Sequence, residues 1–229
     1  PIYFLWAPQI GCFGIQRIHL LNNVMILAGA GVGGGSLNYA NTLYKPGSSY
    51  FQDKQWNTIT DWEEELSPFY DQARRMLGVV TNPHETPADE VIRQVAEEMG
   101  VADTFTATPV GVYFNQPGRT DEDPFFGGAG PARTGCTDCG ACMTGCPVGA
   151  KNTLVKNYLY LAEQAGAEII PMTTVDTVRP RSGDGYVVES HRSGRRWSRR
   201  GRRTFTADHV VFAAGTYGTN KLLLDMQQG

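Results

Sequence analysis

Four cysteines stand close together in residues 136–147, which read CTDCGACMTGCP. The spacing C-x2-C-x2-C-x3-C-P is that of bacterial ferredoxins, in which close-set thiolates hold an iron–sulfur cluster. The fourth cysteine of such a run usually ligates a second cluster, and no second cysteine set occurs in this chain. A single cluster would therefore take its last ligand from Cys146 itself or from Cys12. The candidate metal ligands are Cys136, Cys139, Cys142 and Cys146.

The four cysteines also permit roles that involve no iron–sulfur cluster. Four thiolates suit a structural zinc ion, whereas disulfides are disfavoured in a chain without a visible secretory signal. The cysteines could instead only pack a turn. Cys12 is expected to be an inert buried thiol. A ferredoxin-like electron-transfer module would show a second cysteine set, and because this chain has none, such a module is disfavoured.

Glycines concentrate in a second stretch, residues 29–35, which read GAGVGGG. Glycine allows backbone to approach a ligand closely or to adopt positive φ. Residues 24–28 form an apolar run of strand type, and residues 36–44 are expected to form a short helix that Pro46 ends. Amides at the start of such a helix favour an anion.

The match to a Gly-x-Gly-x-x-Gly dinucleotide fingerprint is weak evidence by itself. Pro46 and the turn at residues 47–49 interrupt the expected crossover helix, and no acidic residue ends a second strand. A simple dinucleotide-dependent dehydrogenase is therefore disfavoured, while a glycine-rich turn without a ligand remains an alternative.

Between the glycine-rich stretch and the cysteines, the chain is expected to be helical up to about residue 100. The pattern Thr60-x-x-Glu63 is a capping box, Ser67-Pro68 indicates a second helix start, and Gly78 a helix end. A helix from Thr86 to Gly100 carries an apolar stripe expected to be buried. Met99 and nearby aromatic residues, namely Trp62, Phe69 and Tyr70, are read as core.

A long loop rich in Gly, Pro and Asp follows at residues 111–131, with an apolar anchor at residues 125–126. A helix is expected over residues 151–166. The strands expected after it cover residues 168–178, 186–190 and 204–206, and form a β-meander. Residues 208–213 indicate a buried strand that runs through a glycine turn into a final helix.

Composition excludes several functions. With 229 residues and 41% hydrophobic residues, the chain can bury a sizeable core. A net charge of −3 gives no long-range attraction for nucleic acid or anionic membranes. Seven arginines between Arg192 and Arg203 are read as a solvated hairpin tip. No apolar run reaches the roughly 20 residues of a membrane span, and no signal peptide is visible at the start.

The longer string at residues 31–46, GVGGGSLNYANTLYKP, resembles the second glycine-rich segment of the glucose-methanol-choline (GMC) flavin oxidoreductases. Within that family it is most similar to the bacterial cholesterol oxidases. The resemblance extends through residues 61–62, 153–158 and 211–215. It implies an incomplete α/β, Rossmann-like FAD-binding fold with a helical and loop insertion and a β-meander.

The resemblance also implies a cofactor site and a division of the chain. Residues 1–49 would be the flavin-contacting part of the FAD-binding domain, residues 50–131 the insertion, and residues 132–229 a cysteine-rich turn with the rest of that domain. The fingerprint unit would precede Pro1, which makes the chain an internal piece. The implied FAD-binding residues are Gly31, Gly33, Gly34, Gly35, Ser36, Asn38, Tyr39, Ala40, Asn41, Thr42, Val175, Ala214 and Gly215.

In this family the segment lies along the isoalloxazine ring, Val175 would meet the adenine, and Ala214 and Gly215 the pyrophosphate and ribose. Residues 38–42 depart from the Asn-Gly-Gly-Met pattern of well-known steroid oxidases, so the ring contacts stay open. The catalytic base, a histidine, would lie beyond Gly229. The chain's own histidines, His19, His84, His191 and His209, are read as structural or surface residues.

The implied activity is FAD-dependent oxidation of a sterol 3β-hydroxyl by hydride transfer to flavin, with isomerisation to the conjugated enone as a further step. A GMC-type dehydrogenase of another hydrophobic alcohol, passing electrons through a cysteine-ligated iron–sulfur cluster, is the alternative. The electron acceptor would be oxygen or another acceptor. No nucleic-acid partner and no transmembrane segment are expected. The expected location is cytoplasmic or membrane-peripheral in a bacterium.

Overall fold

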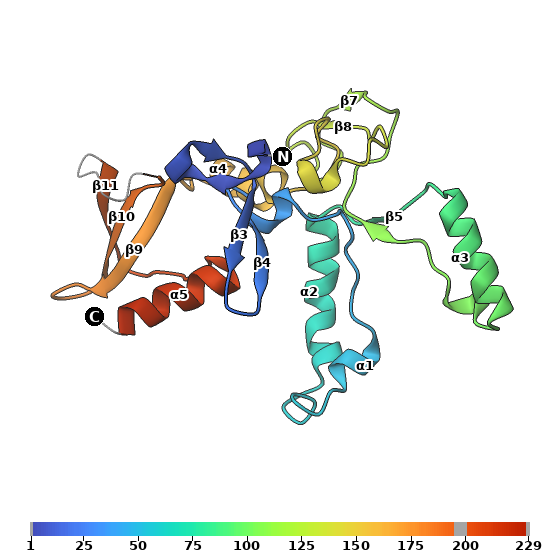
Figure 1. The fold of residues 1–229 in the computed structure, drawn as a ribbon, viewed down its shortest axis with the longest axis horizontal. Coiled ribbons are helices and arrows are strands. Elements are labelled where there is room, and N and C mark those ends of the chain that lie inside the picture. Colours follow the sequence, from blue (N-terminus) through green and yellow to red (C-terminus); the bar gives the residue numbers. More distant parts are fainter. Residues whose placement is uncertain (1, 195–200, 228–229) are drawn as a thin grey trace. The chain divides into compact units, whose positions relative to one another are not determined.

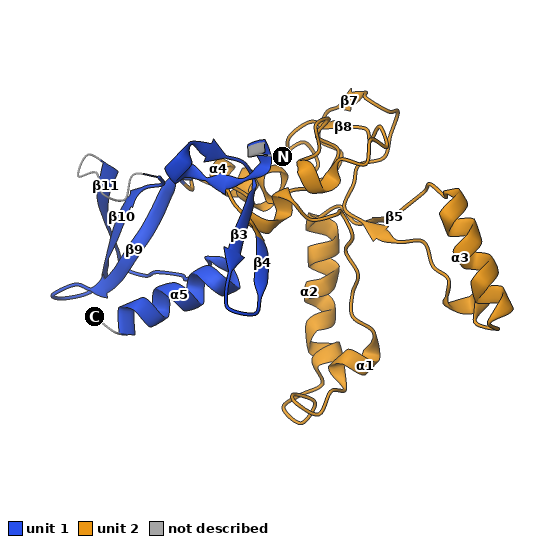
Figure 2. Cartoon of the chain, viewed as in Figure 1, with its two compact units in different colours: residues 1–27, 168–229 blue, residues 28–167 orange. Residues whose placement is uncertain are grey.

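The computed structural model describes residues 2–194 and 201–227 (Figure 1). Its residues group into two compact units, shown in separate colours in Figure 2. Unit 1 comprises residues 1–27 and 168–229, and unit 2 comprises residues 28–167. Both helices and small sheets are present, as predicted for an incomplete α/β fold. The division into three functional segments stays a prediction.

Unit 1 is built around a three-stranded antiparallel meander in the order β11-β10-β9. This confirms the predicted meander, although the first strand begins later than expected and leaves out Glu168–Met172. Helix α5 contacts β9. The bounds are β9 Thr173–Pro180, β10 Tyr186–Arg192, β11 Arg202–Ala207 and α5 Gly215–Gln227.

The start of the chain forms short elements. The first two strands, β1 and β2, pair in antiparallel fashion, and β3 pairs with β4, whose last residues enter unit 2. The bounds are η1 Ile2–Phe4, β1 Trp6–Ala7, η2 Pro8–Ile10, β2 Cys12–Phe13, β3 Gln16–Leu20 and β4 Met25–Gly29. Strand β4 confirms the strand predicted before the glycines.

Unit 2 holds short helices and two-stranded ribbons around a small core. Val110, Val112 and Ala150 are its buried centre, and the partly buried side chains packed against it include Cys136 and Cys146. The elements are η3 Gly34–Leu37, α1 Ser48–Phe51, α2 Trp62–Met76, β5 Val80–Thr81, α3 Pro87–Glu98, η4 Ala102–Thr104, β6 Pro109–Val110, β7 Thr120–Asp121, β8 Arg133–Thr134, η5 Cys142–Thr144, η6 Leu154–Lys156 and α4 Tyr158–Gln164. The core therefore adjoins the cysteine run.

Helix ends follow side-chain acceptors. Helix α3 begins after Thr86, as predicted, and a capping box of Thr86 with Asp89 forms there. The capping box predicted at Thr60 and Glu63 is wrong, because α2 is capped by Asp61, whose carboxylate accepts from the amides of Glu63 and Glu64. Helix α2 continues through Pro68, so the helix start predicted at Ser67-Pro68 is wrong. Leu77 and then Gly78, with φ of 55°, end the helix as expected.

The helix predicted over residues 36–44 is wrong. Only a 3-10 turn forms there, η3. After it the amides of Asn38 and Tyr39 still donate to the Gly35 carbonyl, but no further helical element forms before α1. The reason is competition for acceptors, because the carbonyls of Leu37 and Tyr39 accept from the Lys151 ammonium instead of from amides further along a helix. Asn41 adopts φ of 62°, which a continuing helix excludes.

Two further predictions on the second half need correction. The strand expected at residues 208–213 is absent, and Val211 is 87% exposed. No strand of the described chain pairs with this run, so its backbone lacks the inter-strand hydrogen bonds that would hold it in a sheet. The helix expected over residues 151–166 is split at Asn157, whose side chain caps α4 through the Tyr158 amide.

The apolar stripe of α3 is exposed, contrary to prediction. Val91, Ile92, Val95 and Met99 are 46–70% exposed, and Phe69 on α2 is 62% exposed. No element of the described chain covers the α3 stripe, so amphipathic spacing by itself did not bury it. Within the described residues, no helix is long and apolar enough to cross a membrane. Most of the arginine-rich run, residues 195–200, lies outside the described residues.

Candidate functional site

The glycine-rich segment folds back on itself in unit 2. A Cβ atom on Gly29 would lie 2.3 Å from the carbonyl oxygen of Gly34, so only glycine fits at this crossing. Gly31, Gly33 and Gly34 have φ of 110°, 106° and 52°, which L side chains adopt at a cost. The positive φ predicted for these glycines is confirmed, whereas the close approach at Gly29 is to the chain's own backbone and the approach to a ligand stays a prediction.

One face of the segment is open. A Cβ atom built on Gly34 or Gly35 meets no protein atom within 4 Å. The other side is fixed, because Ser36 Oγ donates to the Gly33 carbonyl at 2.7 Å and accepts from the Leu154 amide at 2.9 Å. The segment is thus a bare backbone strip held from behind, a form that suits a flat ligand lying against it.

A buried lysine joins the glycine-rich segment to the cysteine run. Lys151 is 1% exposed, and its Nζ donates to the carbonyls of Leu37, Tyr39 and Cys142 at 2.9, 3.1 and 2.7 Å. Burial lowers its pKa. Because two of the acceptors lie after the glycines and the third is the carbonyl of Cys142, Lys151 fixes the glycine-rich segment and the cysteine run relative to each other.

Tyr39 and Asn41 add two more links within unit 2. The Tyr39 hydroxyl donates to the Asn152 carbonyl at 2.8 Å, and burial is the main cause that raises the pKa of Tyr39 to about 12. Asn41 Nδ2 donates to Cys142 Sγ at 3.1 Å. Two residues that the resemblance assigned to flavin therefore also make structural contacts, Asn41 with the cysteine run and Tyr39 with the segment that follows it.

The four predicted metal ligands line one cavity of about 260 Å³, together with His84, Asp138 and Lys151. All four are free cysteines, and Cys139 is the exposed one. The loop turns sharply between them, with positive φ at Gly140, Gly145 and Cys146. Among the described residues, no three His, Cys, Asp or Glu side chains are placed to hold a single metal ion.

Two more cations lie in the same unit, Arg133 buried and Lys156 half-buried. Arg133, on β8, is 1% exposed, and its Nε, Nη1 and Nη2 atoms have no hydrogen-bond partner. Its guanidinium lies 5.4 Å from the centre of the Phe125 ring, and burial lowers its pKa to about 10. Lys156 Nζ donates to the Gly149 carbonyl at 2.6 Å, and burial lowers its pKa as well.

Sequence reasoning missed these three cations. Lysine and arginine between small residues are normally solvated, so their type gives no warning of burial. Their position in the sequence could have indicated them, because Arg133 and Lys151 flank the cysteine run on either side.

The remaining predicted cofactor residues belong to unit 1. Val175, on β9, is 40% exposed and pairs with Ser190 beside a bulge. Gly215 has φ of 71° and opens α5, and the Ala214 amide donates to Thr219 Oγ1 at 3.0 Å. Their assignment to FAD stays a prediction.

The described histidines have structural partners, with the exception of His209. His191 is 7% exposed, and its Nδ1 lies 2.9 Å from the Asp176 carboxylate. The His19 ring stacks at 3.9 Å on Tyr217, and burial together with Arg17 lowers its pKa. His84 Nε2 lies 3.8 Å from Asp138 Oδ2 at the cysteine cavity.

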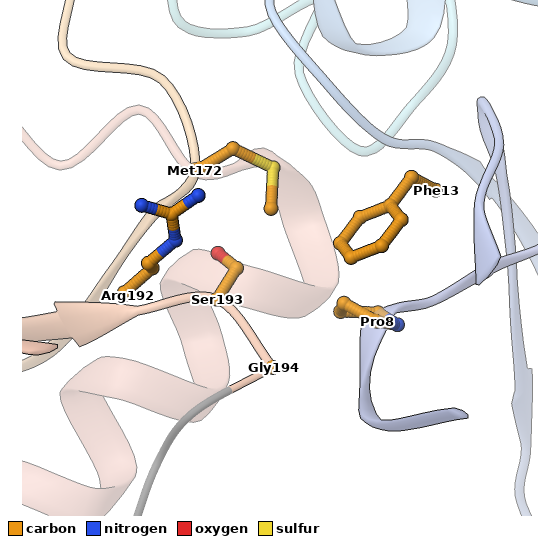
Figure 3. Close-up of a pocket in the computed structure, with 6 residues that line it drawn as sticks. All are labelled: Pro8, Phe13, Met172, Arg192, Ser193 and Gly194. Carbon is orange, nitrogen blue, oxygen red and sulfur yellow. The ribbon is translucent and has the colours of Figure 1, made fainter. Parts of the chain in front are cut away.

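Unit 1 has a hollow of its own, of about 480 Å³. Figure 3 shows the Met172 thioether and the Phe13 ring pointing into it, with Arg192, Ser193 and Pro8 around the edge. It has none of the predicted site residues in its lining.

The chain is similar in sequence to known proteins over the residues that carry these features. Residues 132–226 match the family described as GMC oxidoreductase. The chain is 63% identical to proteins named cholesterol oxidase from two strains of Mycobacterium tuberculosis, CDC 1551 and H37Rv, over 98% of its length. It is 40% identical to a cholesterol oxidase of Acinetobacter baumannii, again over 98% of its length. It spans 39% of the mycobacterial relatives and 42% of the Acinetobacter relative.

Proposed function

We propose, from the match of residues 132–226 to the GMC oxidoreductases and the identity to cholesterol oxidases, that this chain belongs to that family and forms part of the FAD site of an enzyme that oxidises an alcohol. The relatives' name supports a sterol 3β-hydroxyl as the group oxidised and oxygen as the acceptor. The same proposal includes isomerisation of the resulting ketone to the conjugated enone.

The observation that carries the proposal is the open strip at Gly34 and Gly35. Flavin is flat and needs backbone without side chains against its ring, and these two positions have no protein atom within 4 Å of a Cβ. The crossing at Gly29 shapes the strip, and Ser36 holds it from behind. The residues present therefore fit the group.

Bound FAD would supply the hydride acceptor, and the protein would supply binding and orientation. Gly31 to Thr42 would hold the ring system, with Lys151 and Tyr39 keeping this segment in place from the protein side. Val175, Ala214 and Gly215, in unit 1, are proposed to contact the adenosine and pyrophosphate portions. No catalytic base is assigned, because the histidines with described partners are held by structural contacts.

The test is a side chain placed on the strip. Gly35→Val adds two methyl groups beyond a Cβ that meets no protein atom, so the protein itself should tolerate it. A bound flavin would not, and we expect FAD per chain to fall several-fold in the full-length protein, measured by absorbance after gel filtration. The full-length protein without the substitution should be yellow, and its flavin should bleach anaerobically with a 3β-hydroxysteroid.

Gly47→Val is the matched control. Gly47 has no neighbour within 4 Å of a Cβ and has φ of −71°, but it lies outside the strip, before α1. This variant should retain wild-type FAD content. Full FAD occupancy in Gly35→Val would show that the strip does not face the flavin. A colourless full-length protein without substitutions would contradict the flavin proposal as a whole.

A further inference from the structure

The four cysteines of the ferredoxin-spaced run face a common space. Cys136, Cys139, Cys142 and Cys146 all line the cavity of about 260 Å³. A water molecule occupies ~30 Å³ in the liquid, so the cavity has room for a group about nine waters in size. That is the scale of a cube of four irons and four sulfides. Since Cys146 lines the same cavity, the run needs neither a second cluster nor Cys12 to complete its ligands.

The charges around this cavity call for an anion. Lys151 lines it, is 1% exposed and donates only to neutral carbonyls. Arg133, equally buried with three unpartnered nitrogens, lies in the same unit but outside the lining of this cavity. A buried cation without a counter-charge costs several kcal/mol. The one carboxylate in the lining, Asp138, is exposed and stands beside His84. Four thiolates around an iron–sulfur core carry a net negative charge, which would offset the charge of Lys151.

Donors already point at the sulfur atoms. Asn41 Nδ2 lies 3.1 Å from Cys142 Sγ, and the Lys151 amide lies 3.2 Å from Cys146 Sγ. The Asp138 amide lies 3.5 Å from Cys136 Sγ. A neutral thiol is a weak acceptor, whereas hydrogen bonds to thiolate sulfurs stabilise them and tune the potential of a cluster. Such donors are therefore better explained by ligating thiolates than by packing alone.

Zinc and disulfides account for the site less well. A zinc ion needs its four sulfurs about 2.3 Å from one point, but within the described residues no three suitable side chains are placed to hold a single ion. A cluster fills the middle of the cavity with its own atoms, so its ligands stand on the wall. The cysteines are free and not paired in disulfides.

We propose that this cavity binds an iron–sulfur cluster of the cube type, ligated by Cys136, Cys139, Cys142 and Cys146. Lys151 is its buried counter-cation, and Asn41 is its hydrogen-bond donor from the glycine-rich segment. The site goes beyond the flavin proposal and does not depend on it, because the cavity, the cation and the donors belong to the protein whatever binds the open strip.

The experiment uses the full-length protein purified without oxygen. Iron, acid-labile sulfide and zinc are measured per chain, with electron paramagnetic resonance after dithionite reduction. We expect about four irons and four sulfides per chain, as a cube requires, and a signal from the reduced cluster. Absence of iron with four titratable thiols, or one zinc per chain, would overturn the proposal. FAD content is measured separately, so failure of either proposal is visible by itself.

Two variants assign the ligands. Cys139→Ser changes the exposed cysteine, which least disturbs the core, and should lose at least one iron per chain with far-ultraviolet circular dichroism unchanged. Cys12→Ser, in unit 1, is the control and should keep all of its iron. Retention of full iron and sulfide in Cys139→Ser would contradict the proposed ligand set.

A third variant tests the cavity itself. Asn41→Asp tolerates the positive φ at this position but replaces the N–H donor to Cys142 Sγ by an oxygen. Loss of the donor and added negative charge should lower the reduction potential of the cluster. An unchanged potential would place the cluster outside this cavity and overturn the assignment.

Discussion

Asp123 holds the loop that covers Arg133, and its removal gives a prediction with a definite size. Oδ1 accepts from the amides of Phe125 and Phe126 at 2.9 and 3.0 Å. Oδ2 accepts from the amides of Gly128 and Gly130 at 2.8 and 2.9 Å. One carboxylate thus serves four backbone donors, and Phe125 packs over the Arg133 guanidinium.

Asp123→Ala removes all four bonds at once. Each contributes about 1 kcal/mol net, below the ~1.5–3 kcal/mol usual for a charged acceptor because the loop is partly exposed to water. We expect the free energy of unfolding to fall by about 4 kcal/mol, measured by urea denaturation of the full-length protein. Asp123→Asn keeps the shape but turns one acceptor into a donor, so it should lose roughly half of that.

The pH dependence gives an independent check. Burial opposes ionisation of Asp123, but the four amides outweigh it and lower the pKa of its carboxyl. A carboxyl with a lowered folded pKa stabilises the fold above its unfolded pKa of about 3.9, and this stability is lost as pH falls through the folded value. Asp123→Ala should lack this acid-side loss. A loss of under ~1 kcal/mol, with a wild-type acid profile, would refute the reasoning.

Two further predictions concern the glycine-rich segment. Tyr39→Phe removes the donor to a partly buried backbone carbonyl and should lower stability by about 1–2 kcal/mol in urea denaturation, while a smaller change would show that water replaces the hydroxyl. Gly29→Ala forces a Cβ within 2.3 Å of the Gly34 carbonyl, so the strip must shift. We expect it to lose FAD and stability together, and unchanged FAD content by absorbance would contradict the proposed site.

Local patterns in the sequence predicted what depends on neighbouring residues alone. The predicted start of α3 at Thr86 is confirmed, and the contacts that fix it, between Thr86 and Asp89, lie within one turn. The glycines marked a place of positive φ and close approach. The cysteine spacing marked a candidate metal site before any cavity was visible. The alternation of apolar and turn residues indicated the β-meander.

Only the tertiary structure decided where distant segments meet. Lys151 takes the carbonyls after the glycines as acceptors, which prevents the predicted helix there and ties that segment to the cysteine run. The apolar run at residues 208–213 is not a strand, because strand formation needs a partner that the described chain does not provide. Burial of Arg133 likewise depends on Phe125 and on a loop closed by Asp123. A residue's own type sets its possible contacts, whereas its burial and charge partners are set by segments far away in the sequence.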